Sequence, residues 1–179
     1  HAIQVANLIF TILRIEKMET FDSEIQKWIK EFVSTHNEKI GKVPCPFAKQ
    51  AMLKERINYL SVEKHTILPI INSLADNWDD KYEVVVIYCP TEDLTPEELS
   101  KIVKDFNNIA MTKDIVALED HPNDPEILNG ESMNFSKCIL ILVQRLSKLN
   151  NASEILKKQG YYDNWPKENY DDVVRWRTT

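Results

Sequence analysis

Two uninterrupted apolar runs, YEVVVIYC at residues 82–89 and KCILILVQ at residues 137–144, constrain the fold of this chain most strongly. A strand with one face in water alternates apolar and polar residues. A continuous run of Val, Ile and Leu is instead typical of a strand that is buried on both faces. The sequence therefore predicts a sheet that is covered by helices.

Two further strands are predicted at RINYLSV, residues 56–62, and at DIVALEDHP, residues 114–122. Pro122 stops the second of these strands, because proline cannot donate to a sheet ladder. The strands alternate with segments of helical periodicity, which implies crossover connections between them.

The clearest helix start is TPEE, where Thr95 is the expected N-cap and Glu98 closes a capping box. Its predicted buried face consists of Leu99, Ile102, Val103, Phe106 and Ile109. Another helix is expected from about Thr66. An S-x-x-Q capping box at Ser23 and Gln26 predicts that the first helix begins at Ser23 and ends near residue 35. A short helix is expected at 153–159, before Gly160.

These elements predict one α/β (α+β) domain, a sandwich with about four strands covered by helices, ferredoxin-like or related. We expect this domain to span residues 18–179, including an aromatic-rich C-terminal tail. Residues 1–17 are interpreted as an N-terminal extension, because METFDSEIQKWIK from Met18 resembles a natural start. The tail aromatics are expected to pack onto the body, the alternative being a ligand pocket or a dimer surface.

Composition excludes several classes of function. The net charge of −6 and the scattered basic residues disfavour nucleic-acid binding, which needs clustered Lys and Arg. The GxGxxG and GxxxxGK[ST] fingerprints of nucleotide sites are missing, so no cofactor is indicated. The apolar part of residues 1–17 is too short to span a bilayer, and we expect no membrane partner. Three widely spaced cysteines favour a reducing, cytoplasmic location.

Cys45 is the first candidate functional residue. It lies between Pro44 and Pro46 at a predicted helix start, with Lys42 and Lys49 nearby in the sequence. The N-terminus of a helix stabilises a thiolate, so Cys45 could be a nucleophile or a metal ligand. The structural alternative is a protonated thiol that is buried beside Phe47.

His121 is the second candidate. It lies in LEDHPNDPE, at the end of a predicted strand, among Glu119, Asp120, Asp124 and Glu126. Carboxylates beside an imidazole favour acid–base chemistry, and the same groups can ligate a divalent metal. The metal candidates are His121, Asp124 and Cys45. The alternative is a solvated loop whose acidic residues cap turns.

Two resemblances involve the CPF segment. C-P-F followed by Cys or Ser is similar to the thiol motif of glutaredoxin-like proteins and omega-type glutathione transferases. Ala48 replaces the second thiol here, which excludes a dithiol mechanism.

From about Asp22 to Arg145 the chain also resembles an uncharacterised bacterial domain family of unknown function, through CPFAK at 45–49 and HP at 121–122. This resemblance implies the same fold and marks Cys45 and His121, but it implies no activity.

The sequence thus leaves two functional hypotheses. The first is a small cytoplasmic enzyme whose site joins Cys45, as thiolate, to His121 and Asp120, as the acid–base pair. The second is a non-catalytic domain for protein interaction or oligomerisation, through the tail aromatics or the apolar N-terminal segment. A small-molecule ligand and a homo-oligomer are the partners that these hypotheses imply.

Overall fold

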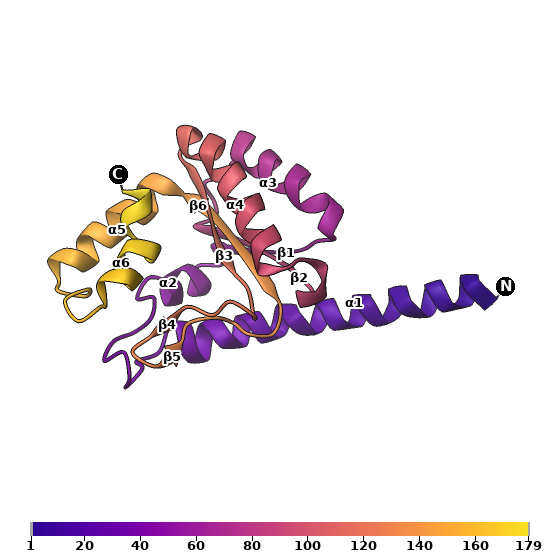
Figure 1. The fold of residues 1–179 in the computed structure, drawn as a ribbon, viewed down its shortest axis with the longest axis horizontal. Coiled ribbons are helices and arrows are strands. Elements are labelled where there is room, and N and C mark those ends of the chain that lie inside the picture. Colours follow the sequence, from indigo (N-terminus) through magenta and orange to yellow (C-terminus); the bar gives the residue numbers. More distant parts are fainter. Residues whose placement is uncertain (1, 179) are drawn as a thin grey trace.

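The computed structural model describes residues 2–178 as a four-stranded sheet with helices on both of its faces, together with a separate two-stranded sheet of residues 127–128 and 131–132 (Figure 1). The α-helices are α1 (Ala2–Trp28), α2 (Ala48–Leu53), α3 (Ile67–Asp76), α4 (Pro96–Ala110), α5 (Leu146–Lys158) and α6 (Lys167–Val173). The strands are β1 (Ile57–Ser61), β2 (Val84–Cys89), β3 (Ile115–Asp120), β4 (Ile127–Leu128), β5 (Glu131–Ser132) and β6 (Ile139–Arg145). Single turns of other helix types are η1 (Ile29–Val33), η2 (Lys64–Thr66), η3 (Thr91–Asp93), η4 (Met111–Lys113) and η5 (Arg175–Arg177).

The main sheet has four strands in the order β1-β2-β6-β3. β1 and β2 are parallel, and β6 is antiparallel to both β2 and β3. Strands β1, β2 and β3 therefore all run in one direction, and their carboxyl ends meet at the same end of the sheet. The predicted α+β class is confirmed. The main strands and helices follow the order β-α-β-α-β-β, so the fold is related to the ferredoxin-like β-α-β-β-α-β arrangement but not identical to it.

Helices α3 and α4 cover one face of the sheet. The capping box at Thr95 and Glu98 is present as predicted, with Pro96 at the first helical position. Leu99, Val103 and Phe106 pack into the core of this face, together with residues of all four strands. Ile109 was expected in this core but is largely exposed, because it lies off the stripe that Leu99, Val103 and Phe106 define.

Helix α1 covers the other face, and its packing begins at Met18. Met18, Phe21 and Ile25, with Ile29 of η1, form an apolar stripe against Val86, Tyr88 and Leu140 of the sheet. The N-terminal half of α1 continues past the sheet as an unsupported helix (Figure 1). The predicted helix start at Ser23 is wrong. The hydroxyl of Ser23 bonds to the carbonyl of Thr20 within the helix, which already begins at Ala2 because residues 2–22 contain no glycine or proline to interrupt it.

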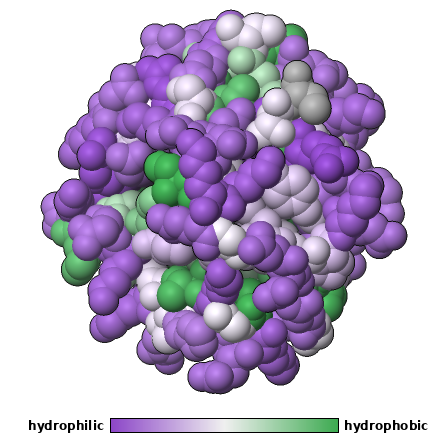
Figure 2. Space-filling model, turned by 90° about the vertical axis from the view of Figure 1, so that its left-hand side faces the viewer, coloured by the Kyte–Doolittle hydropathy of each residue, from purple (hydrophilic) through white to green (hydrophobic). Residues whose placement is uncertain are grey.

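The C-terminal segment forms a separate layer of α5, α6 and η5 at the side of the sheet (Figure 1). Its aromatic rings contact one another edge-on: Tyr161, Tyr162, Trp165 and Tyr170. The outer surface on this side is mostly hydrophilic, with small separate apolar areas (Figure 2). Tyr161 is buried and donates to the carbonyls of Val43 and Pro44, so it packs onto the body as predicted, whereas Trp176 is 40% exposed.

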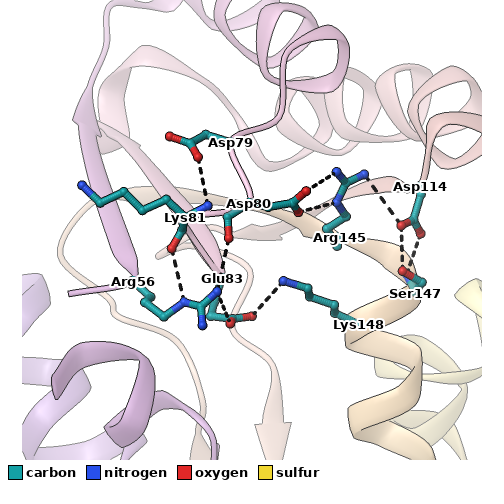
Figure 3. A network of polar contacts seen from close by, with 9 residues as sticks. All are labelled: Arg56, Asp79, Asp80, Lys81, Glu83, Asp114, Arg145, Ser147 and Lys148. Atoms are coloured by element: carbon teal, nitrogen blue, oxygen red, sulfur yellow. Dashed lines mark hydrogen bonds and ion pairs between the residues drawn. The ribbon is translucent and has the colours of Figure 1, made fainter. Parts of the chain in front are cut away.

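An ion-pair network lies at the end of the sheet where β1, β2 and β3 begin, opposite to their carboxyl ends (Figure 3). Arg145 makes two parallel hydrogen bonds of 2.9 Å to the carboxylate of Asp80, in the turn before β2. Asp114 accepts hydrogen bonds from both the backbone and the hydroxyl of Ser147, and so caps the N-terminus of α5. Every charged group drawn there except Asp79 and Lys81 has an opposite charge beside it, so we assign this end a structural role.

Candidate functional site

A row of residues crosses the sheet at the carboxyl ends of the parallel strands. Ser61 pairs with Tyr88, Tyr88 pairs with Leu140, and Asp120 pairs with Leu140. Residues directly opposite one another in a sheet project from the same face. Tyr88 and Leu140 both pack on the α1 side, so all four side chains lie on that face. In α/β proteins this end of the sheet is where ligands usually bind.

A groove of about 830 Å³ opens above the Ser61 end of this row. One wall is a face of α1, and the other wall is the segment from Ser61 through η2. The groove is lined by Thr11, Arg14, Ile15, Met18, Glu19, Asp22, Ser61, Val62, Glu63, Lys64, His65, Thr66, Tyr88 and Asp93. Its volume is within the range of small-molecule sites.

Tyr88 contributes the most deeply buried polar side chain to the groove. Only 5% of its surface is exposed. Burial, and secondarily the negative charge of Asp22, raise the pKa of Tyr88 to about 12, so the phenol keeps its proton. Within residues 2–178 no hydrogen-bond partner contacts its hydroxyl. The hydroxyl oxygen is not one of the fully buried unpaired polar atoms of these residues, so it reaches solvent in the groove.

The charged residues of the groove divide into paired and unpaired groups. Arg14 lies 2.9 Å from Asp93, which ties α1 to η3, and Lys64 lies 3.1 Å from Glu98 outside the groove. Glu63 lies beside His65. Two carboxylates on α1, those of Glu19 and Asp22, have no cation within ion-pair distance among the residues that the structure describes.

Asp120 lies at the other end of the row. Its carboxylate accepts hydrogen bonds from the backbone N–H of Phe135, at 3.0 Å, and from the side-chain amide of Asn134, at 3.2 Å. No Lys or Arg of the described chain pairs with it. Burial is the dominant influence and raises the pKa of Asp120 to about 6. Asp120 therefore orders the loop before β6 and is also a group that titrates near neutral pH.

His121 is buried with both of its ring nitrogens occupied. Asn123 donates its backbone N–H to Nδ1 at 3.0 Å, so Nδ1 carries the lone pair and Nε2 carries the proton. Nε2 then donates to the carbonyl of Leu94 at 2.9 Å. A general base or a metal ligand needs a free ring nitrogen. The geometry favours a structural role for His121, which joins the end of β3 to the turn before α4.

Cys45 lies in the turn before α2, which begins three residues later than the cysteine. Its backbone N–H bonds to the carbonyl of Val33, and Tyr161 and Tyr162 lie near its thiol. The backbone N–H groups of Phe47 and Ala48 favour a thiolate, but burial outweighs them and raises the pKa of Cys45. This direction is opposite to the one that an activated thiolate requires.

His121 forms a backbone bridge with Asp124, and among the described residues no hydrogen bond joins Cys45 to either of them. The contacts of Cys45 run to η1 and to the C-terminal tail, and those of His121 run to the turn before α4. Among residues 2–178, no three His, Cys, Asp or Glu side chains are grouped so that they could hold a metal ion. Asp124, the third metal candidate, is exposed. The Cys45–His121 site stays a prediction that these contacts do not support.

Sequence reasoning missed the groove because its residues come from separate segments. Asp22 was placed just before the predicted start of the first helix, and Tyr88 was treated as one apolar member of a buried strand. One signal was present: Tyr88 and Ser61 are the polar residues near the carboxyl ends of the two strands that pair in parallel. That pairing is not evident from the sequence.

The chain matches no protein-family model, no curated protein and no solved structure. Among the described residues, no helix combines the length and the apolar character needed to cross a membrane.

Proposed function

We propose that this protein binds a small molecule in the groove between α1 and the carboxyl ends of β1 and β2. One observation carries the proposal: the groove contains a buried phenol, Tyr88, whose hydroxyl has no partner among the described residues. A ligand that bonds to this hydroxyl would replace the solvent that reaches it in the groove.

Two further features support the same groove. It mixes an apolar part, formed by Ile15, Met18 and Val62, with a few polar groups, as binding sites commonly do. The pairs Arg14–Asp93 and Lys17–Glu92 join α1 to η3, so the wall of the groove is held in place. Both pairs are at least partly exposed, and such pairs add little to stability.

We place this activity in the cytoplasm, without a nucleic-acid partner. The three cysteines are free, which suits a reducing compartment. The net charge of −6 opposes association with a phosphate backbone.

The test is a fragment screen against the ¹⁵N-labelled full chain. We expect shifts at the amides of residues 61–66 and of Tyr88. Ser61→Trp would fill the groove and abolish these shifts, whereas Ser73→Trp, on the exposed side of α3, would leave them unchanged. Shifts gathered at Cys45 or His121 would contradict the groove and favour the site predicted from the sequence.

A second candidate function is self-association through α1. Leu8, Ile9, Ile12 and Leu13 are each between 46% and 60% exposed on the part of α1 that extends past the sheet. Residues 2–13 contain no charged side chain, so we propose a second copy of the same apolar helix as the occupant. Contiguous exposed apolar surface of this kind usually marks an interface.

Mass measurement by light scattering tests this second function. We expect a dimer that dissociates in the double variant Leu8→Gln, Ile12→Gln. Leu53→Gln, at an equally exposed leucine of α2, is the matched control and should leave the mass unchanged. A wild-type protein that is monomeric at about 100 μM would overturn self-association through α1, because a specific helix pair should have a Kd below that concentration.

A further inference from the structure

The groove carries negative charge that its own cations do not neutralise. Glu19 and Asp22 lie one turn apart on the same face of α1, and both line the groove. The cations that share the groove already have partners, since Arg14 pairs with Asp93, which also lines the groove, and Lys64 pairs with Glu98. A bound anion would add a like charge beside two carboxylates, at a Coulombic cost.

The hydroxyl of Tyr88 has no partner among the described residues and opens into the groove, where a ligand can reach it. It lies on the floor of the same groove, close enough to Asp22 for the carboxylate to influence its ionisation. A protonated phenol presents an oxygen that accepts hydrogen bonds. The ring of Tyr88 is packed in the core, so the two groups together offer a negative charge and a hydrogen-bond acceptor.

We infer that the ligand of this groove is an organic ammonium ion, an amine that carries an apolar group. The inference rests on the proposed function of the groove and names its ligand class. The ammonium group lies between Asp22 and Tyr88, with Glu19 adding to the attractive potential. The apolar group covers Ile15 and Met18, which line the same wall of α1.

The probes are benzylammonium, benzyl alcohol and benzoate, which share one ring and differ in charge. Each is titrated into the ¹⁵N-labelled full chain at pH 7.5, and binding is followed at the amides of residues 61–66. We expect benzylammonium to bind about tenfold more tightly than benzyl alcohol, and benzoate to bind most weakly. The preference should shrink at high salt.

Variants assign the charge preference to the groove. Asp22→Asn should reduce the affinity for benzylammonium about fivefold to tenfold and leave that for benzyl alcohol unchanged. Tyr88→Phe should reduce the affinity for benzylammonium by a smaller factor than Asp22→Asn does. Glu16→Gln removes the same charge from an exposed position of α1 that does not line the groove, and should have no effect.

The outcomes separate the ligand class from the groove itself. Equal binding of all three probes at residues 61–66 would overturn the ammonium preference and keep the proposed function. Benzylammonium binding that survives Asp22→Asn would also overturn the preference. Absence of shifts at these amides with every probe, at millimolar concentration, would overturn both. Circular dichroism of each variant confirms that a lost signal is not lost structure.

Discussion

Tyr88 and Asp120 lie in one row of the sheet, each paired with Leu140 of the strand between them. Their backbones are thus two strand spacings apart, roughly 10 Å, and both side chains face α1. Both groups are buried and acidic, and burial raises the pKa of each. Only the pKa of Asp120, about 6, lies in the range over which solution pH commonly varies. Asp120 is therefore expected to change charge in that range, and Tyr88 is not.

The titration of Asp120 is expected to make the stability of the protein depend on pH. Its pKa in the folded state, about 6, is above the ordinary value of 3.8, so the folded protein binds this proton more tightly than the unfolded chain. The stabilisation is fully present below about pH 4 and is lost as the pH rises through 6. Between pH 4.5 and 7.5 the contribution to the free energy of unfolding should fall by about 2 kcal/mol.

Asp120→Asn isolates this effect. The free energy of unfolding of the variant relative to wild type, from urea denaturation, should rise by about 2 kcal/mol between pH 4.5 and 7.5. Asp172→Asn, at an exposed carboxylate on α6, should show no such change. A difference between Asp120→Asn and wild type that does not vary with pH would contradict a titrating Asp120.

His121 is expected to act in stability and not in metal binding. His121→Ala removes two hydrogen bonds from a buried site and should lower the free energy of unfolding by about 2–3 kcal/mol. His121→Gln can still donate to the carbonyl of Leu94 and should recover part of the loss. Zinc at tens of micromolar should not raise the melting temperature of wild type, because neither ring nitrogen is free. A zinc-dependent rise that His121→Ala abolishes would show that the ring can bind metal.

Local patterns predicted the secondary structure well where one segment decides the outcome. The four strands at residues 57–61, 84–89, 115–120 and 139–145 were each recognised from continuous apolar runs or β-rich composition. The capping box at Thr95 was equally local. Ser23 shows the limit of this reasoning, because its capping pattern is correct in form but lies inside a helix that already began at Ala2.

The candidate site could not be predicted in the same way, because it depends on pairing between distant segments. Asp22 and Tyr88 are near one another only because α1 packs across the ends of β1 and β2. Conversely, His121 and Cys45 lie in distinctive sequence motifs. In the structure, backbone groups occupy both ring nitrogens of His121, and burial raises the pKa of the Cys45 thiol. Which groups have partners is decided by tertiary contacts.

Arg177 is expected to hold the C-terminal layer in place. It is 4% exposed and donates from Nε, Nη1 and Nη2 to the carbonyl of Val173, to Asn150 and to Ser153. Arg177→Ala leaves those acceptors unpaired and should lower the free energy of unfolding by about 2–3 kcal/mol. Hydrogen exchange should accelerate in α5 and α6 more than in the sheet.

The neighbouring Arg175 provides the control for Arg177. Its side chain is half exposed and pairs with Asp171 at the surface, so Arg175→Ala should change stability little. Equal destabilisation by the two variants would show that the loss reflects η5 in general and not the buried guanidinium.

Cys45 is expected to react slowly with iodoacetamide. Burial raises the pKa of its thiol, so the midpoint of labelling against pH should lie above about 8.5, the ordinary value of a free cysteine. Mass spectrometry of the alkylated peptide separates Cys45 from Cys89 and Cys138, which are more deeply buried in the sheet layers. Tyr161→Phe, whose ring lies near the thiol, should leave the midpoint high, because desolvation and not the phenol is the main cause. A midpoint below about 7 would instead restore Cys45 as a nucleophile, since the thiolate would then be the main form at neutral pH.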